Sequence, residues 1–522
     1  METVNAVATA LTIAAFILTP IYNLFLHPLR TFPGPLICRA SSWPRHFHLV
    51  RGSLPLFTAA LHKVYGPVVR VAPGELSFIS PQAWRDIYLP LPDRQGAREL
   101  KKDGRFYSIF GHCAGNIMTA DFHHHELLRR QLSPGFSDRT LRLQEPIIQR
   151  YVDILVGKLR ELSDKNPINL TDWFTYLTFD IISRMSLGSD LGCLDRSQFH
   201  PWVHAIKRNL REFVLLQLLA YFDLGWLNRR MTSSRVLNGR CRHEDLTRRM
   251  LQSRLEDDEE HFDIISVLQN LKEPFVRHGR LTRSAHDTYR EVKSFEQLHS
   301  NMSLLILAGS ETSATLMTGF FSLLAENAEA RERVTREVRA AFSCEDEITL
   351  AAVKSLSYLL ACIHETLRLL PPTPNAMPRL VGLGGHTIAG HHVPQHVRPS
   401  LLMRRRAVLM IRQTVVYVAP WAAGRSEENF TLPLEFHPER FLQDPTFAGD
   451  SLGAAQPFGI GHRSCLGRSL AYAETQLALA KMLYNFEVDV SPGSLGWTER
   501  QKAFVLWDKT EMTATVRPIG SN

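Results

Sequence analysis

The stretch "PFGIGHRSCLGRSLAYAE", from Pro457 to Glu474, lies near the C-terminus of a chain of 522 residues. It places Cys465 among three glycines and directly ahead of an amphipathic helical pattern. A helix N-terminus offers free N–H groups and a dipole that favour negative charge and lower the pKa of a thiol. Arg463, two residues earlier, can pair with a carboxylate. The stretch therefore predicts a cysteine thiolate that ligates a metal, with a structural cysteine in a turn as the alternative.

The spacing of these residues resembles a family motif. Phe458, Gly461, Arg463, Cys465 and Gly467 fit F-x-x-G-x-R-x-C-x-G, the haem-binding signature of cytochrome P450. The resemblance implies that Cys465 is the axial thiolate ligand of haem b and that the other four residues bind the cofactor. Glycines would let the backbone approach a flat ligand closely.

Two further motifs follow the family order. Glu365-Thr366-Leu367-Arg368 matches E-x-x-R, and Pro438-Glu439-Arg440-Phe441 resembles P-E-R-F. Charge pairs three residues apart are common on helices, so E-x-x-R is specific only because "LLPPTP" follows it. The resemblance implies a buried ion network of Glu365, Arg368 and Arg440 that fixes the loop of the cysteine.

A third motif, "AGSET" from Ala308 to Thr312, lies in a long apolar helical pattern that spans Ser294 to Asn327. It fits A/G-G-x-D/E-T of the same family. The resemblance implies that Gly309 leaves room above the haem. It also implies that Thr312, with Glu311 and ordered water, delivers protons to the distal oxygen.

The propionates of the haem would have partners elsewhere in the chain. "HHHELLRR" places His125 and Arg129 where the family has W-x-x-x-R. Arg379 follows Pro378 and matches a family position that also meets a propionate. The His125 substitution makes its role less secure than that of the arginines, although a histidine can still donate a hydrogen bond.

The N-terminal segment predicts a membrane anchor. No charged residue occurs from Thr3 to Leu29, and about 20 apolar residues cross a bilayer. We expect an anchor at 1–26, a proline-rich hinge at 27–35 and one catalytic domain at 36–522. Arginines after the anchor predict that the domain of this single-pass protein lies on the cytosolic side of the membrane. The family resemblance implies that this membrane is the endoplasmic reticulum. A cleaved signal peptide and a secreted protein are the alternative.

The remaining chain predicts a mainly α (α+β) fold, with one helix-rich domain and small β-sheets. It carries a formal net charge of +8, but clusters typical of nucleic-acid binding are lacking, so we expect no nucleic-acid partner. Seven cysteines without zinc or disulfide spacing indicate a reducing compartment.

The resemblance implies a monooxygenase that inserts one atom of O2 into a small apolar substrate, by hydroxylation or epoxidation. The chain looks most like fungal microsomal members that serve secondary metabolism, so a polyketide or terpenoid substrate is expected. Electrons would come from NADPH through a separate cytochrome P450 reductase. Two alternatives stay open: an isomerase or dehydratase of the same fold that uses no O2, and a membrane protein that has lost haem.

Substrate contacts are expected from four segments. These are Phe106–Met118, Arg211–Trp226, Leu304–Ala308 and Pro374–Met377. Apolar residues there could equally belong to the core.

One stretch departs from the family spacing. His396–Arg412 separates two expected strands by seventeen residues and contains five arginines and no acidic residue. Hairpin loops usually have about 2–5 residues. We interpret the stretch as an intron translated in frame. The alternative is a basic loop that touches lipid headgroups or the reductase.

Overall fold

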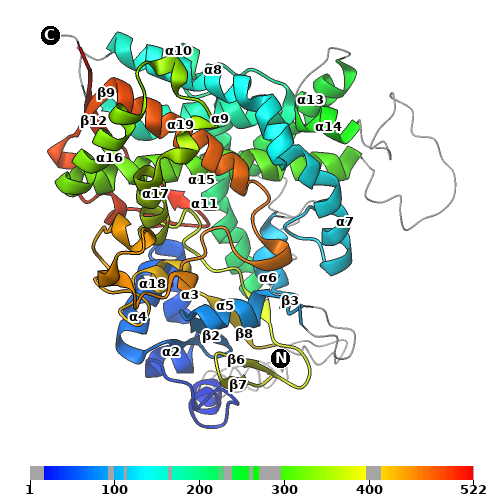
Figure 1. The fold of residues 1–522 in the computed structure, drawn as a ribbon. Helices are drawn as coiled ribbons and strands as arrows, with labels where there is room; N and C mark the ends of the chain where they lie inside the picture. Colours follow the sequence, from blue (N-terminus) through cyan, green and yellow to red (C-terminus); the bar gives the residue numbers. More distant parts are fainter. Residues whose placement is uncertain are drawn as a thin grey trace.

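The computed structural model describes residues 17–91, 99–110, 115–162, 167–222, 224, 227, 238–257, 263–269, 295–395 and 413–520. Helices form the larger part of the molecule, and short strands gather at one end with the N-terminal helices (Figure 1). The fold thus has the helix-rich character with small sheets that the sequence predicts.

The α-helices differ widely in length, and the longest of them lies in the middle of the chain. In chain order they are α2 (Leu36–Ala40), α3 (Trp43–Arg51), α4 (Leu54–Tyr65), α5 (Pro81–Tyr88), α6 (Gly104–Tyr107), α7 (Phe122–Leu132), α8 (Asp138–Leu162), α9 (Leu170–Leu187), α10 (Cys193–Arg196), α11 (Pro201–Tyr221), α13 (Asn238–Glu256), α14 (Ile264–Gln269), α15 (Phe295–Glu326), α16 (Ala328–Ala341), α17 (Ser357–Leu369), α18 (Pro420–Gly424) and α19 (Arg468–Asn485).

The strands are short and make four small sheets, with orders β1-β2-β8-β5-β3, β4-β12-β9, β6-β7 and β10-β11. Their bounds are β1 (Val68–Ala72), β2 (Glu75–Phe78), β3 (Lys101–Lys102), β4 (Ile168–Asn169), β5 (Arg379–Leu380), β6 (His386–Ile388), β7 (His391–Val393), β8 (Val415–Val418), β9 (Phe486–Val490), β10 (Lys502–Ala503), β11 (Trp507–Asp508) and β12 (Thr513–Pro518). The first sheet brings β3, β5 and β8 together from distant parts of the chain.

Helix α15 is the central element of the fold. Its residues are apolar nearly all round, and most of them are buried, as expected for a helix that runs through a core. It packs closely on α9, since a Cβ added at Gly309 would lie 2.6 Å from Cγ1 of Ile182. Small residues therefore allow the two helix backbones to approach.

Among the described residues, α15 is long and apolar enough to cross a membrane, but its burial marks it as a core helix. The predicted anchor at 1–26 lies mostly outside the described residues, which begin at Ile17. Residues 17–25 are helical, and several of their apolar side chains are exposed.

Candidate functional site

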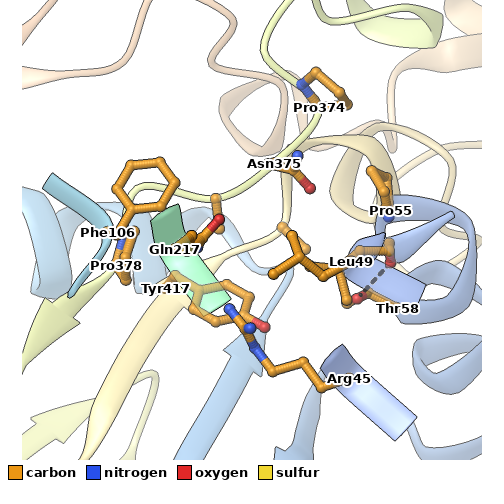
Figure 2. A pocket seen from close by; sticks show the side chains of 13 residues that line it. Arg45, Leu49, Pro55, Thr58, Phe106, Gln217, Pro374, Asn375, Pro378 and Tyr417 are labelled. Atoms are coloured by element: carbon orange, nitrogen blue, oxygen red, sulfur yellow. Dashed lines mark hydrogen bonds between the residues drawn. The ribbon is translucent and has the colours of Figure 1, made fainter. Parts of the chain in front are cut away.

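A cavity of about 360 Å³ lies between α15 and the loop that precedes α19. Ala308 and Thr312 of α15 line one part of it, and Phe458, Gly459 and Cys465 of the loop line another. A smaller cavity of about 30 Å³ adjoins it (Figure 2). The structure thus brings the predicted cysteine and the predicted threonine, 153 positions apart, into one cavity.

The loop holds Cys465 in a fixed turn. Its backbone N–H donates to the carbonyl of Phe458 at 2.7 Å, and α19 begins three residues later at Arg468. Burial raises the pKa of the Cys465 thiol, whereas the Gly467 backbone N–H and the guanidinium groups of Arg129 and Arg468 lower it. The expected effect of the helix end is present but is outweighed by burial. A cation bound at the sulfur would reverse this balance, because coordination deprotonates a thiol outright.

Basic side chains crowd one side of the main cavity. Lys102, His125, Arg129, Arg379 and Arg463 all line it. Burial together with Arg463 and Arg379 lowers the pKa of Lys102 to about 6, and burial together with Arg463 and Lys102 lowers the pKa of His125 to about 3. Near pH 7 His125 is therefore neutral and Lys102 is mostly neutral, so three arginine cations and two further hydrogen-bonding groups line this wall, a set that fits a ligand carrying carboxylates. The thiol and this wall together fit haem, which has one iron and two propionates.

The three arginines of this wall already have protein partners. Arg463 makes a bidentate pair with Glu99, with both N···O distances at 2.6 Å. Arg379 donates to the hydroxyl of Tyr107, and Arg129 donates to the carbonyl of Ser464. The positions are therefore fixed before any ligand binds.

Glu99 and Lys102 belong to this site but were not predicted from the sequence. The ammonium group of Lys102 donates to the carbonyls of Met118 and Ala120 at 2.6 and 2.7 Å. Lys102 pairs with Arg379 in the β3–β5 ladder, which sets both side chains near the cavity. A two-residue strand leaves no recognisable pattern in the sequence, so no signal pointed to this pairing.

Thr312 and Glu311 face different surroundings. The Thr312 hydroxyl donates to the carbonyl of Ala308 at 2.7 Å and is exposed to the cavity. Glu311 does not line the cavity; its Oε2 accepts from Nζ of Lys509 at 2.5 Å, and both side chains are at most 3 % exposed. Its other oxygen, Oε1, is buried without a hydrogen-bond partner in the described part of the chain.

The glycines have roles that differ from those predicted from the motifs. Gly309 does not leave room above the cavity, because its missing Cβ would point at Ile182. Gly461 has a φ of +70°, and a Cβ there would lie 2.8 Å from Leu89, so it serves the turn. Of the three glycines near the cysteine, only Gly459 lines the cavity; Gly461 and Gly467 do not.

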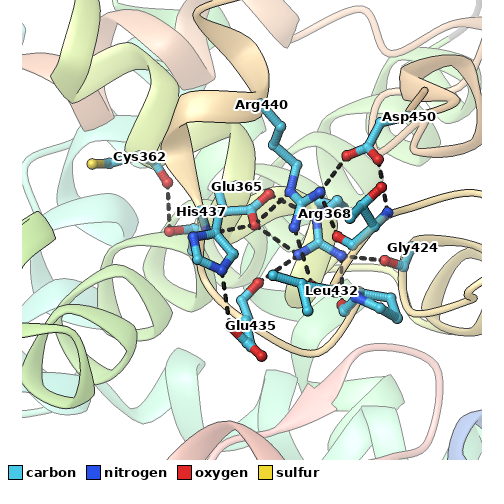
Figure 3. Close-up of polar contacts among 12 residues, drawn as sticks. Cys362, Glu365, Arg368, Gly424, Leu432, Glu435, His437, Arg440 and Asp450 are labelled. Atoms are coloured by element: carbon cyan, nitrogen blue, oxygen red, sulfur yellow. Dashed lines mark hydrogen bonds and ion pairs between the residues drawn. The ribbon is translucent and has the colours of Figure 1, made fainter. Parts of the chain in front are cut away.

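The charged residues of the two other motifs come together in one buried cluster (Figure 3). Arg368 binds both oxygens of Glu365 at 2.6 and 2.7 Å, and Nε of Arg440 donates to Glu365 at 3.0 Å. Arg440 also pairs with Asp450, so two cations meet two anions. The carbonyls of Pro433 and Glu435 accept from Arg368, which ties the connecting loop to α17.

The predicted substrate segments contribute unequally to the main cavity. Phe106, Phe110, Leu304, Leu307 and Met377 line it, as do other residues of their segments. No described residue of Arg211–Trp226 does, although the neighbouring Leu210 does. Val505 and Leu506 also line it and were not predicted, because only the C-terminal chain path brings them there.

Comparison with known proteins gives consistent similarities. A family model described as Cytochrome P450 matches residues 41–404 and 406–513. The chain is 39 % identical over 516 residues to the cytochrome P450 monooxygenase tpeC of Talaromyces stipitatus, covering 98 % of this chain and 94 % of the relative. It is 36 % identical over 503 residues to averantin hydroxylase of Dothistroma septosporum, covering 96 % and 89 %. A third relative, cytochrome P450 monooxygenase 1 of Neocamarosporium betae, is 35 % identical over 516 residues, covering 98 % of each.

Proposed function

The chain belongs to the cytochrome P450 family and is an oxygenase enzyme, and we propose that it is a haem-thiolate monooxygenase that inserts one atom of O2 into a small apolar substrate. The observation that carries the proposal is the shared cavity of Cys465 and Thr312, bordered by a wall of cations. This chemistry uses a thiolate ligand, basic side chains that bind carboxylates and a hydroxyl group, and residues of all three kinds line one cavity.

Each side chain has a distinct role in the proposal. Haem, when bound, would supply an iron that activates O2, with the thiolate favouring O–O cleavage. Cys465 would ligate the iron, and Arg129, Arg379, Arg463 and His125 would hold the propionates, with the missed Lys102 as a further donor. Phe458 and Gly459 would shape the cofactor pocket, and Gly461 would hold the turn of the loop.

Proton delivery is assigned to α15. Thr312 lies at the cavity surface and can pass a proton, while Glu311 lies behind it. Lys509 holds the Glu311 carboxylate on the side away from the cavity lining. We assign Glu311 to the solvent side of the proton path and Thr312 to the cavity side.

The substrate is proposed to be a secondary metabolite of polyketide or terpenoid type. The main cavity exposes chiefly apolar side chains, including Phe110, Leu304, Leu307 and Val505, which suits an apolar molecule. The fungal sources of the relatives and the hydroxylase named among them support hydroxylation in such a pathway.

The partners proposed are NADPH-cytochrome P450 reductase, which would supply the electrons, and membrane lipid. Exposed apolar side chains gather on α2, α3 and the end of α11, where the rings of Trp43 and Phe222 lie 5.7 Å apart. The exposed members are Leu36, Ile37, Trp43, Phe47, Val50, Phe222 and Leu224. Such a patch suits contact with a bilayer of the endoplasmic reticulum.

Reconstitution tests the reaction class. Membranes that hold the protein and the reductase should convert candidate polyketide or terpenoid intermediates to products 16 Da heavier, in a manner that needs NADPH and O2. Incubation under ¹⁸O2 should add 18 Da instead. Product formed without NADPH and O2 would favour the isomerase or dehydratase alternative.

A variant tests proton delivery. Thr312→Ala should keep the haem spectrum but release hydrogen peroxide in place of product, because the cavity-side hydroxyl is lost. Thr315→Ala is the matched control, since Thr315 lies on the same helix, donates to the carbonyl of Glu311 and does not line the cavity. Equal coupling of NADPH to product in the Thr312 variant and the control would contradict the assignment.

A truncation tests the anchor. Removal of Met1–Leu26 should move the protein largely out of the membrane fraction and leave haem binding intact. Residual binding to vesicles that contain anionic lipid is expected from the exposed patch. Loss of haem in a well-expressed truncated protein would mean that the segment packs into the fold.

A further inference from the structure

The small cavity beside the main one is built from segments that are far apart in the sequence. It lies between α3, α4, α11 and the segment 374–378, with Tyr417 of β8 at its base (Figure 2). Phe106 and Asn375 line both cavities, so these two side chains form the partition between them. A ligand held in the main cavity can therefore reach the small one by displacing few atoms.

One donor at this cavity has no protein partner. Arg45 is only 5 % exposed, and its Nε donates to Glu75 at 2.6 Å. Its Nη2 donates to the hydroxyl of Tyr221 at 3.0 Å, but its Nη1 is buried without a hydrogen-bond partner in the described part of the chain. Buried donors without partners are uncommon, and a bound water or ligand usually explains them.

A second polar side chain faces the same space. Gln217 of α11 is 2 % exposed, lines the cavity, and makes no side-chain hydrogen bond to any described residue. Gln217 and Arg45 line the same cavity as Tyr417 (Figure 2). Thr58 differs, since its hydroxyl lines the cavity but already donates to the carbonyl of Leu54 at 2.9 Å.

The local charges are balanced without any ligand. Arg45 pairs with Glu75, and Arg105, whose guanidinium also lies against the Tyr221 ring, pairs with Asp103 at 2.8 Å. The site therefore offers hydrogen-bond donors rather than an uncompensated charge. A volume of about 30 Å³ exceeds the space that one water needs and suits a single oxygen-bearing group.

We propose that this small cavity is a substrate subsite that binds an acceptor oxygen, of a ketone or a carboxylate, through the guanidinium group of Arg45 and the amide of Gln217. The apolar body of the same substrate lies in the main cavity. The proposal rests on the proposed function and narrows the substrate class to molecules with an oxygen acceptor at one end. Arg45 and Gln217 are specificity-determining residues in this assignment.

The test compares probes that differ only in one oxygen. 2-Acetylnaphthalene and 2-ethylnaphthalene have nearly the same shape, and 2-naphthoate adds the carboxylate arm. Dissociation constants are measured by equilibrium dialysis on the full-length, haem-loaded protein. Gln217→Leu and Arg45→Lys should each weaken ketone binding about tenfold relative to the hydrocarbon, the ratio that loss of one good hydrogen bond produces. Arg45→Lys keeps the charge beside Glu75 but loses the fork of donors.

Thr58→Val is the matched control, since it removes a satisfied hydroxyl from the same cavity and should leave the ratio within about twofold. A larger loss for 2-naphthoate than for the ketone identifies a carboxylate, and the reverse identifies a ketone. If neither variant lowers oxygen-specific affinity, or no oxygen-bearing probe binds, the proposal is overturned.

Two features keep the test decisive. Thermal unfolding shows whether the Arg45→Lys protein is folded. If that protein is not folded, the test rests on Gln217→Leu, which does not change the pair of Arg45 and Glu75. Dialysis requires no turnover. An oxygen-specific loss in a protein that oxidises nothing would therefore contradict the proposed monooxygenase reaction and leave the subsite standing.

Discussion

Cys465 is the residue on which the proposed chemistry depends. We expect Cys465→Ser to abolish activity, because a neutral hydroxyl cannot replace thiolate donation to iron. The reduced, CO-bound protein should lose the red-shifted Soret band of a thiolate-ligated haem. Circular dichroism checks that the variant keeps the secondary structure of the parent protein. Ser464→Ala is a suitable control at the neighbouring position. A serine variant that kept the band would show that another residue is the ligand.

Gly309 offers a second prediction at this scale. A Cβ there would lie 2.6 Å from Cγ1 and 2.8 Å from Cδ1 of Ile182. Gly309→Ala should therefore lower the free energy of unfolding by about 1–3 kcal/mol, the usual cost of overpacking. Urea titration measures this cost. The same substitution in an Ile182→Ala background should cost much less, and an equal cost in both backgrounds would contradict the contact.

Motifs identified residue types at the site, but not where their side chains point. Cys465, Arg463 and Thr312 line the cavity as the motifs implied. The role predicted for Gly309, to leave room above the haem, was wrong. The sequence of a helix that is apolar on all sides does not reveal which neighbour a given position contacts. The subsite at Arg45 was not anticipated either, since an orphan donor exists only once the chain is folded.

At the scale of elements, the contact of α19 with α15 gives a pH-dependent prediction. Glu474 of α19 is buried, and burial raises its pKa to about 8, against a smaller opposing effect of the Ser313 hydroxyl. A carboxyl whose pKa is higher in the folded state contributes stability below its unfolded pKa, near 4.3, and loses it as pH rises through about 8.

We therefore expect Glu474→Gln to be more stable than the parent protein at pH 8, by up to about 4 kcal/mol, with the difference shrinking toward pH 5. Thermal unfolding at several pH values measures it. A stability difference that does not change between pH 5 and pH 8 would contradict a protonated Glu474.

Long helices were predictable as elements, whereas short strands were not. The apolar pattern Ser294–Asn327 corresponds to α15, Phe295–Glu326, because a long uninterrupted period leaves a clear signal. The two-residue strands β3 and β5 carry no such signal, yet they place Lys102 beside Arg379. The sequence therefore could not predict the β3–β5 pairing, which places Lys102 among the basic side chains of the cavity.

At the scale of the whole molecule, the ion network ties α17 to the segment 431–450, which precedes the cysteine loop in the chain. Glu365 of α17 binds Arg368 and Arg440, and Arg440 also binds Asp450. The buried charges balance one another, so removal of a single partner would leave an uncompensated charge. The order of the motifs along the chain predicted this group. Asp450 was not predicted, because it belongs to no motif.

The stretch His396–Arg412 lies outside the described residues, but both of its flanks are described. The hydroxyl of Thr414 donates to the carbonyl of Pro394 at 2.7 Å, so the two ends of the stretch meet. The backbone carbonyl of Thr414 also accepts from the backbone N–H of Val381. The β5–β8 pairing begins at the next residues of both strands. The family match is interrupted at residue 405, inside the stretch. Joining Gln395 to Gln413 would therefore leave a tight turn of ordinary length.

We predict that a protein without His396–Arg412 binds at least as much haem per mole as the full chain, because a long loop is replaced by a short turn while both flanks keep their hydrogen bonds. The formal net charge falls from +8 to +3, since five arginines and no acidic residue are removed. Sequenced transcripts should mostly lack the seventeen codons. A Gly-Ser segment of equal length serves as the control for loop length. Transcripts that uniformly keep the codons, together with lost activity in both the deletion and the Gly-Ser protein, would make the basic stretch functional.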